Sequence, residues 1–344
     1  MSNEISGSIQ IFDSRSSQNL QLITRYQPKY MVTIFELDNS YFDIETMGQF
    51  LYKHSEFSIG NKDDYIGKLY RGWLRWNGDS AEIRVGLQKV NFGSAQILRS
   101  LAWFDTIDPR DPQENTDGVY SVLCRYYFMN NASIWLWGIL SEDKYKGMEI
   151  VKSEKHAIEF GGRFQYPTLG GELALSIHRR EIDNSMSIDN PAENKLGLDG
   201  RWDSGIGAWF ESALVSREKD SPFYSLEKWF TSGADYTFAT GNGIHVTIEH
   251  LYLAVSEDTI TTSGREENST AIQADYPLNM LDTLVGLSVY NWKTERFAHF
   301  LSVRRTYDYL SIQLNLFLNP NIENSEQALT LSGNSLQLVL EYNF

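Results

Sequence analysis

The stretch LQLVLEYNF, residues 336–344, alternates large apolar residues with mostly polar ones and ends the chain on an aromatic residue. A period of two residues predicts a β-strand with one apolar face, made of Leu336, Leu338, Leu340, Tyr342 and Phe344. Strands this regular are unusual at the end of a soluble protein, because chain termini tend to fray. In a membrane-spanning barrel the last strand must be fully paired, because no backbone edge can face lipid. We therefore expect a barrel, with the edge strand of a soluble sandwich as the alternative.

The same alternation recurs along the chain in segments of about ten residues, the length with which a tilted strand spans a membrane. Short connections rich in Gly or Asn alternate with long polar ones. The short connections are 77–79, 130–132, 168–171, 204–207, 240–243, 281–283 and 307–309. The long ones are 54–65, 92–117, 143–154, 183–192, 257–267 and 319–333. Tight turns at one end and loops at the other predict an antiparallel up-and-down meander.

Counting these segments gives fifteen strands from Ile66 to the chain end and three more upstream, at 5–14, 20–36 and 41–53. The predicted fold class is therefore all-β: a transmembrane antiparallel β-barrel of eighteen strands, forming a single domain over the whole chain. A barrel of sixteen strands is the alternative, because Pro28 lies in the second segment and proline cannot donate to a strand ladder.

Composition agrees with this prediction and excludes other classes. The net charge of −15 argues against a nucleic-acid partner. No run of eighteen apolar residues occurs in the sequence, so helical membrane spans are excluded. Aromatic residues make up 13% of the chain and suit the interfacial girdles of a membrane barrel, with an aromatic-rich soluble β-protein as the alternative.

Charged residues decide which face of each strand points into the barrel. In KLYRGWLRW, Arg71 and Arg75 share one face, and Tyr70 lies on the other. A charge on the lipid face near the midplane costs about 2–4 kcal/mol for Arg or Lys, so we expect the charged face to line the lumen. The same assignment on the other strands predicts these pore-lining residues: Arg71, Arg75, Glu82, Arg84, Gln88, Arg125, Glu159, Arg163, Glu172, Arg180, Asp199, Arg201, Glu211, Asp235, Glu249 and Arg304.

Two stretches depart from this pattern. The segment ASIWLWGIL, residues 132–140, is apolar on both faces, so its orientation is undecided. The connection 92–117 begins with apolar and aromatic residues and continues into DTIDPRDP. A solvated loop does not need so many apolar residues, so we expect this connection to fold into the lumen and narrow it. The residues of the predicted constriction are Trp103, Phe104, Asp105, Asp108, Arg110 and Asp111.

The chain end resembles the last strand of bacterial outer-membrane proteins, in which a terminal Phe after alternating apolar residues is the assembly signal. The order of residues in 84–111 also resembles a motif of alginate-export-like and related porins. It is carried here by Arg84, Gly86, Gln88, Asn91, Phe92, Gly93, Asp105, Asp108, Pro109 and Asp111. This resemblance implies a porin of the bacterial outer membrane, with periplasmic tight turns, extracellular long loops and one infolded loop that sets the constriction.

A porin would pass small hydrophilic solutes by passive diffusion, possible solutes being sugars or anionic oligosaccharides, and would contact the lipid bilayer and lipopolysaccharide. The alternative is a barrel that serves as a scaffold or sleeve for a partner protein. Common catalytic motifs are absent from the sequence, so we expect no enzymatic activity. We expect no cofactor, although Asp105, Asp108 and Asp111 could offer carboxylate oxygens to Ca²⁺. Monomer and trimer both remain open.

Overall fold

The computed structural model describes residues 2–13, 18–37, 39–57, 60–108, 110, 116–183, 191–218, 224–256, 264–319 and 333–344. These residues contain eighteen strands: β1 Ser2–Phe12, β2 Gln18–Leu37, β3 Ser40–Phe57, β4 Gly60–Gly78, β5 Ala81–Gln88, β6 Val119–Tyr127, β7 Ser133–Leu140, β8 Ile158–Thr168, β9 Gly171–Glu181, β10 Ala192–Ser204, β11 Ile206–Arg217, β12 Leu226–Phe238, β13 Ile244–Ser256, β14 Arg265–Pro277, β15 Asp282–Asn291, β16 Arg296–Thr306, β17 Leu310–Leu318 and β18 Asn334–Asn343. Within the described ranges, no helix has the length and apolar character needed to cross a membrane.

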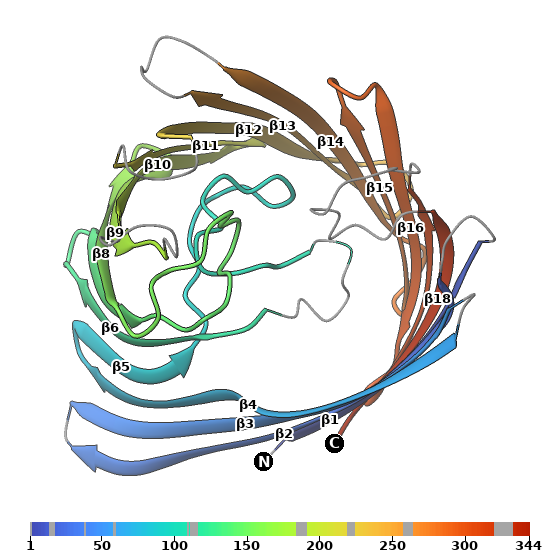
Figure 1. Ribbon diagram of the computed structural model, residues 1–344, viewed down its shortest axis with the longest axis horizontal. Helices are drawn as coiled ribbons and strands as arrows, with labels where there is room; N and C mark the ends of the chain where they lie inside the picture. Colours follow the sequence, from blue (N-terminus) through green and yellow to red (C-terminus); the bar gives the residue numbers. More distant parts are fainter. Residues whose placement is uncertain are drawn as a thin grey trace.

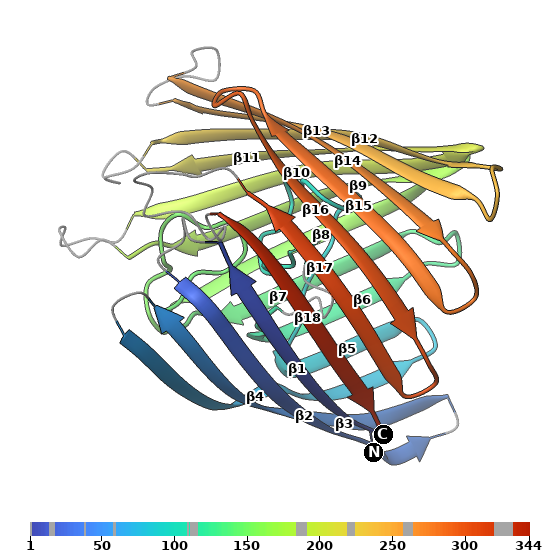
Figure 2. The same ribbon diagram turned by 90° about the vertical axis from the view of Figure 1, so that its right-hand side faces the viewer.

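The sheet closes on itself. Each strand pairs antiparallel with its neighbours in the chain, and β1 pairs with both β2 and β18, with Ile9 opposite Leu338. Figure 1 looks into the resulting ring, and Figure 2 shows the tilted strands with the two chain ends side by side. The prediction of eighteen strands is therefore confirmed, and the alternative of sixteen is wrong. Pro28 lies inside β2, at a point where the described ladder to β3 has no pair.

Alternation along the strands separates an apolar exterior from a polar interior. On β8, Ile158 and Phe160 are 72% and 57% exposed on the outside, whereas Glu159 and Arg163 are buried on the inside. Large apolar side chains are exposed in the same way on most other strands, with a few polar ones among them, such as Arg179 and Asn194 on β9 and β10. The charged residues were thus predicted correctly to lie mostly on the inside, and we look for a site there.

Two predictions about β3 and β4 are wrong. Tyr70 does not face outward: it is buried, because the ladder steps from the pair Met47–Arg71 to the pair Gly48–Leu69 and leaves Tyr70 as an extra residue. A bulge of this kind reverses the facing of every residue beyond it. The connection expected at 54–65 is also mostly strand, since β3 and β4 extend to within a few residues of each other.

Candidate functional site: the barrel interior

Residues 89–118 connect β5 to β6, and their described part, 89–108, 110 and 116–118, lies inside the ring of strands (Figure 1). We call this described part the first inserted segment. Their buried side chains form one apolar cluster with the inner faces of β6, β7 and β11: Val90, Phe92, Leu101, Trp103, Phe104, Val119, Leu123, Trp137, Ile139 and Ala213. Phe92 stacks on Trp137 with 5.5 Å between ring centroids. Strand β7 is therefore apolar on both faces because one face packs on this segment and the other is on the outside.

Two wall carboxylates hold the backbone of this segment. Glu249 on β13 accepts hydrogen bonds from the backbone N–H groups of Gln96 (2.6 Å), Ile97 (3.0 Å) and Leu98 (2.5 Å). It also accepts one from the indole N–H of Trp209, at 3.0 Å. A carboxylate with four donors is well satisfied, although the Glu249 side chain is completely buried.

Glu211 on β11 also holds the backbone of the segment, at two residues that flank the stretch 96–98. It accepts hydrogen bonds from the backbone N–H groups of Ala95 (2.8 Å) and Leu101 (2.9 Å). Gly93 is required beside it for two reasons. Its φ of +103° is rarely adopted by L-residues, and a Cβ atom would lie 2.2 Å from the Glu211 Oε1 atom.

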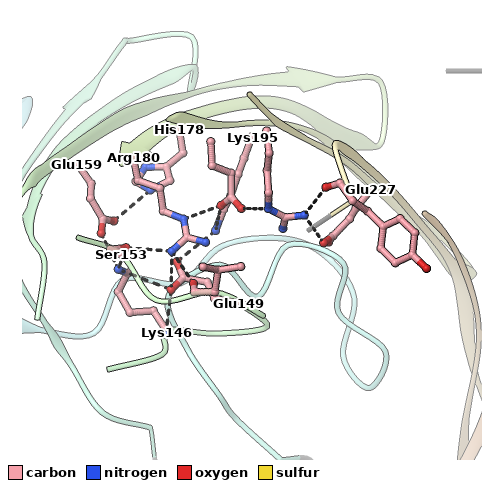
Figure 3. A network of polar contacts seen from close by, with 12 residues as sticks. Lys146, Glu149, Ser153, Glu159, His178, Arg180, Lys195 and Glu227 are labelled. Carbon is pink, nitrogen blue, oxygen red and sulfur yellow. Dashed lines mark hydrogen bonds and ion pairs between the residues drawn. The ribbon is translucent and has the colours of Figure 1, made fainter. Parts of the chain in front are cut away.

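The loop between β7 and β8, residues 141–157, also enters the ring, and we call it the second inserted segment (Figure 1). Its Lys146 Nζ atom lies 2.6 Å from Glu159 on β8. Its Glu149 carboxylate lies 3.1 Å from Arg180 on β9 and 3.3 Å from Lys195 on β10. All five side chains are at most 5% exposed, and Figure 3 shows them converging.

The network continues along the wall from β9 to β12. Glu193 contacts Arg180 at 2.5 Å and Arg217 at 2.7 Å, and Arg217 contacts Glu227 at 2.7 Å (Figure 3). Four cations and four carboxylates thus share the network: Lys146, Arg180, Lys195 and Arg217 with Glu149, Glu159, Glu193 and Glu227. The connection predicted at 143–154 as an ordinary polar loop is in fact packed inside the barrel by these charges.

A cavity of about 800 Å³ remains between the first inserted segment and strands β14–β17. Its wall side is lined by Gln273, Asp275, Thr283, Val285, Phe300, Ser302, Arg304, Thr306 and Gln313. Side-chain amides form a chain along this wall: Gln313 donates to Asn315 at 2.8 Å, and Asn315 donates to Gln337 at 3.0 Å. This side of the interior therefore combines a polar cavity with a smaller apolar cluster of Ala271, Leu287, Phe300 and Phe317, against which Ile97 and Leu98 of the first inserted segment pack.

A cluster of arginines lies on β4–β6, near the short turns. Arg84 lies 3.0 Å from Glu82, and Arg125 lies 3.6 Å from the same carboxylate. Arg75 pairs with Asp43 on β3. Aromatic rings flank the guanidinium groups, with Arg125 4.0 Å from the centroid of Trp135. Cation–π contacts of this kind hold the arginines in place.

All sixteen residues predicted to line the pore lie on strands, and they divide into two groups by exposure. The buried group is Arg71, Glu82, Gln88, Glu159, Arg163, Arg180, Asp199, Glu211 and Glu249. The partly exposed group is Arg75, Arg84, Arg125, Glu172, Arg201, Asp235 and Arg304. Whether they line a conducting pore stays a prediction. Sequence reasoning missed Lys146 and Glu149, because charges in a connection normally indicate a solvated loop. It also missed Lys195, which shares the inward face of β10 with Asp199 and Arg201 and could have been found by the same alternation.

The predicted constriction residues lie in the first inserted segment. Trp103, Phe104 and Asp105 are buried, with Asp105 paired to Arg99. The guanidinium group of Arg110 donates two hydrogen bonds to Asp108, at 2.8 and 3.0 Å, and its backbone N–H donates a third, at 2.9 Å. Burial raises the pKa of the Asp108 carboxyl, but the hydrogen bonds and charge of Arg110 outweigh burial and lower it below its ordinary value. Asp111 lies outside the described residues, so Ca²⁺ binding and the narrowing of the pore stay predictions.

Ser176 and His178 are the residues of the interior that come nearest to a catalytic pair. Ser176 accepts a hydrogen bond from Arg163 at 3.1 Å, and His178 contacts Trp137 and Glu159 at 3.2 Å each. The described contacts of the two side chains therefore lead to different partners. The expectation of no enzymatic activity stays a prediction.

No protein-family model and no curated protein matches the chain. Solved structures are similar to it over its whole length. OccK8 (OprE) of Pseudomonas aeruginosa has a TM-score of 0.63 at 12% identity, covering 100% of this chain and 97% of its own. OccK5 (OpdH) of the same organism has a TM-score of 0.62 at 12% identity, with the same coverage.

The Escherichia coli protein Wzi is also similar, with a TM-score of 0.61 at 9% identity. The match covers 99% of this chain and 84% of Wzi, which is described as an outer-membrane protein involved in capsule assembly and a carbohydrate-binding β-barrel. At such low identities the likeness shows the fold: this chain has the closed β-barrel fold of these proteins.

Proposed function

We propose that this chain is a passive channel of the bacterial outer membrane for small hydrophilic solutes. The observation that carries the proposal is the cavity of about 800 Å³ on the inside of a closed barrel whose outside is apolar. An apolar exterior and a closed sheet suit lipid, because each described strand is paired with a neighbour on both sides. A polar cavity inside such a wall suits solutes that carry their own hydrogen-bonding groups.

In this proposal the short turns face the periplasm, and the longer loops face the outside and contact lipopolysaccharide. Solutes pass on the β14–β17 side, because the two inserted segments and their partners fill the β5–β13 side. Sugars and anionic oligosaccharides are the candidate solutes. A scaffold or sleeve for a partner protein is the second candidate, favoured by the extent to which the inserted segments fill the ring.

Single-channel recording of the refolded protein in a planar bilayer tests the proposal. We expect steady conductance that falls in Thr283→Trp, because residue 283 lines the cavity on β15. Leu284→Trp is the matched control, since the next residue of the same strand points outward. Absence of conductance from a folded barrel would overturn the channel and support the scaffold. Equal conductance in the two variants would show that solutes and ions do not pass through this cavity.

A further inference from the structure

The cavity wall presents many hydrogen-bonding groups and little free charge. Four charged side chains line it: Arg99, Arg110, Asp275 and Arg304. Arg99 is paired with the buried Asp105, and the guanidinium group of Arg110 forms two hydrogen bonds with Asp108. The two other charges, Asp275 and Arg304, have opposite signs, so the charges at the cavity sum to zero when Asp105 and Asp108 are counted with the arginines that they pair with.

Side-chain amides and hydroxyls make up the rest of the polar lining. Gln313 on β17 lies at their centre: its amide donates to Ser302 at 2.9 Å, and its carbonyl oxygen accepts from Arg304 at 3.0 Å. Gln273 on β14 donates to Asp275 at 2.9 Å. Amides and hydroxyls both donate and accept, and solute hydroxyl groups have the same dual capacity.

The cavity also offers apolar surface beside these polar groups. Phe92 of the first inserted segment and Phe300 on β16 both line it, although only 7% and 6% of these residues is exposed. A pyranose ring has C–H faces that pack on an aromatic ring and an equatorial rim of hydroxyls that form hydrogen bonds. The cavity volume of about 800 Å³ lies within the range of pockets that hold small molecules.

We infer that this cavity is a selectivity site for uncharged, hydroxyl-rich solutes, the size of a mono- or disaccharide. The inference rests on the proposed channel function and narrows it. Two of the three lining arginines, Arg99 and Arg110, would have to leave their aspartates to pair with an anionic solute, and Arg304 shares the lining with Asp275. An uncharged solute exchanges hydrogen bonds with water for hydrogen bonds with the wall. Anionic sugars are thereby disfavoured at this cavity, and the arginines of β4–β6 lie outside its lining.

The test compares two probes on the same open channel: maltose and sodium glucuronate, at equal concentration and matched ionic strength. We expect maltose to interrupt the single-channel current at millimolar concentration, with glucuronate at least tenfold weaker. Gln313→Met removes the central amide and should weaken the maltose block by roughly fivefold, the equivalent of one hydrogen bond. Gln21→Met is the matched control, because Gln21 is an equally buried, inward-facing glutamine outside the cavity lining.

The possible outcomes test the selectivity inference and the channel function separately. A channel that conducts but is blocked better by glucuronate than by maltose overturns this inference and leaves the channel intact. The same holds if Gln313→Met and Gln21→Met respond alike to maltose while both retain the circular dichroism of the folded barrel. A folded barrel that passes no current contradicts the channel itself, so the two failures are distinguishable.

Discussion

The two inserted segments occupy the same barrel but are held by different interactions. The first brings its own apolar core and attaches its backbone to the carboxylates of Glu211 and Glu249. The second is attached by the side-chain charges of Lys146 and Glu149 and by a short backbone bridge between Ser153 and Ile182. The first attachment depends on hydrogen bonds in a fixed geometry, and the second on charge balance. Different substitutions should therefore release each segment.

The largest effect is expected where removal of one group leaves several charges unbalanced. Glu149→Ala leaves Arg180 and Lys195 buried with one carboxylate fewer, and breaking a buried pair costs roughly 3–5 kcal/mol. We expect a lower free energy of unfolding in urea and new proteolytic cleavage within 141–157. Replacing Lys195 by Met in the same chain should restore part of the loss.

Glu142→Ala is the control for this variant. Glu142 belongs to the same segment, but its pair with Lys144 is exposed and is worth at most about 1 kcal/mol. If Glu149→Ala proved no more harmful than Glu142→Ala, the charge network would not be what holds the second segment.

A smaller effect is expected at the backbone attachment. Glu249→Ala leaves the N–H groups of residues 96–98 without their acceptor, at about 2–4 kcal/mol after the segment relaxes toward water. Cleavage should appear within 92–108 and not within 141–157. Glu249→Gln keeps one acceptor oxygen, so its free energy of unfolding should lie between those of the wild type and Glu249→Ala. Glu266 is exposed, and Glu266→Ala should change the free energy of unfolding little. Cleavage of both segments together would show that they do not attach independently.

The smallest effect concerns pH. Because Arg110 lowers the pKa of Asp108, the pair stabilises the folded state above the ordinary carboxyl value of 3.8 and loses that contribution as pH falls through the lowered pKa. The Asp108 side chain is 43% exposed, so solvent screening limits the effect to below about 1 kcal/mol. Urea unfolding should separate the wild type from Asp108→Asn at pH 7, and the difference should shrink by pH 3. A difference that grew on acidification would contradict this pairing.

The barrel itself could be predicted from sequence, because the rule that separates its two faces is simple and repeats on every strand. The strand count and the inward position of the charged residues follow from that rule. The rule failed at Tyr70 because a bulge changes the register between two strands. The alternation within a single strand does not show such a change.

Of the two inserted segments, only the first could be predicted to lie inside the barrel, and the reason is physical. An apolar run such as 97–104 is out of place in a solvated loop, so the first inserted segment left a signal in the sequence. The strand at 132–140, which is apolar on both faces, was a second signal of the contact between the first inserted segment and the barrel wall. The two signals together could have predicted that contact. The charged residues of 141–157 gave no such signal. A sequence containing Lys146 and Glu149 looks the same whether these side chains contact water or the barrel wall.

The pairing of β1 with β18 has a consequence for how the barrel forms. It joins the two ends of the chain, with hydrogen bonds in both directions between Asn3 and Phe344 at 2.7 and 2.9 Å. Among the ladders of the described strands, this one has the greatest sequence separation, and contacts of this kind carry the highest loop-closure entropy. Until they form, β1 and β18 are two open edges that other chains could extend. Closure is thus the step at which an intermediate prone to misassembly becomes a protein without edges.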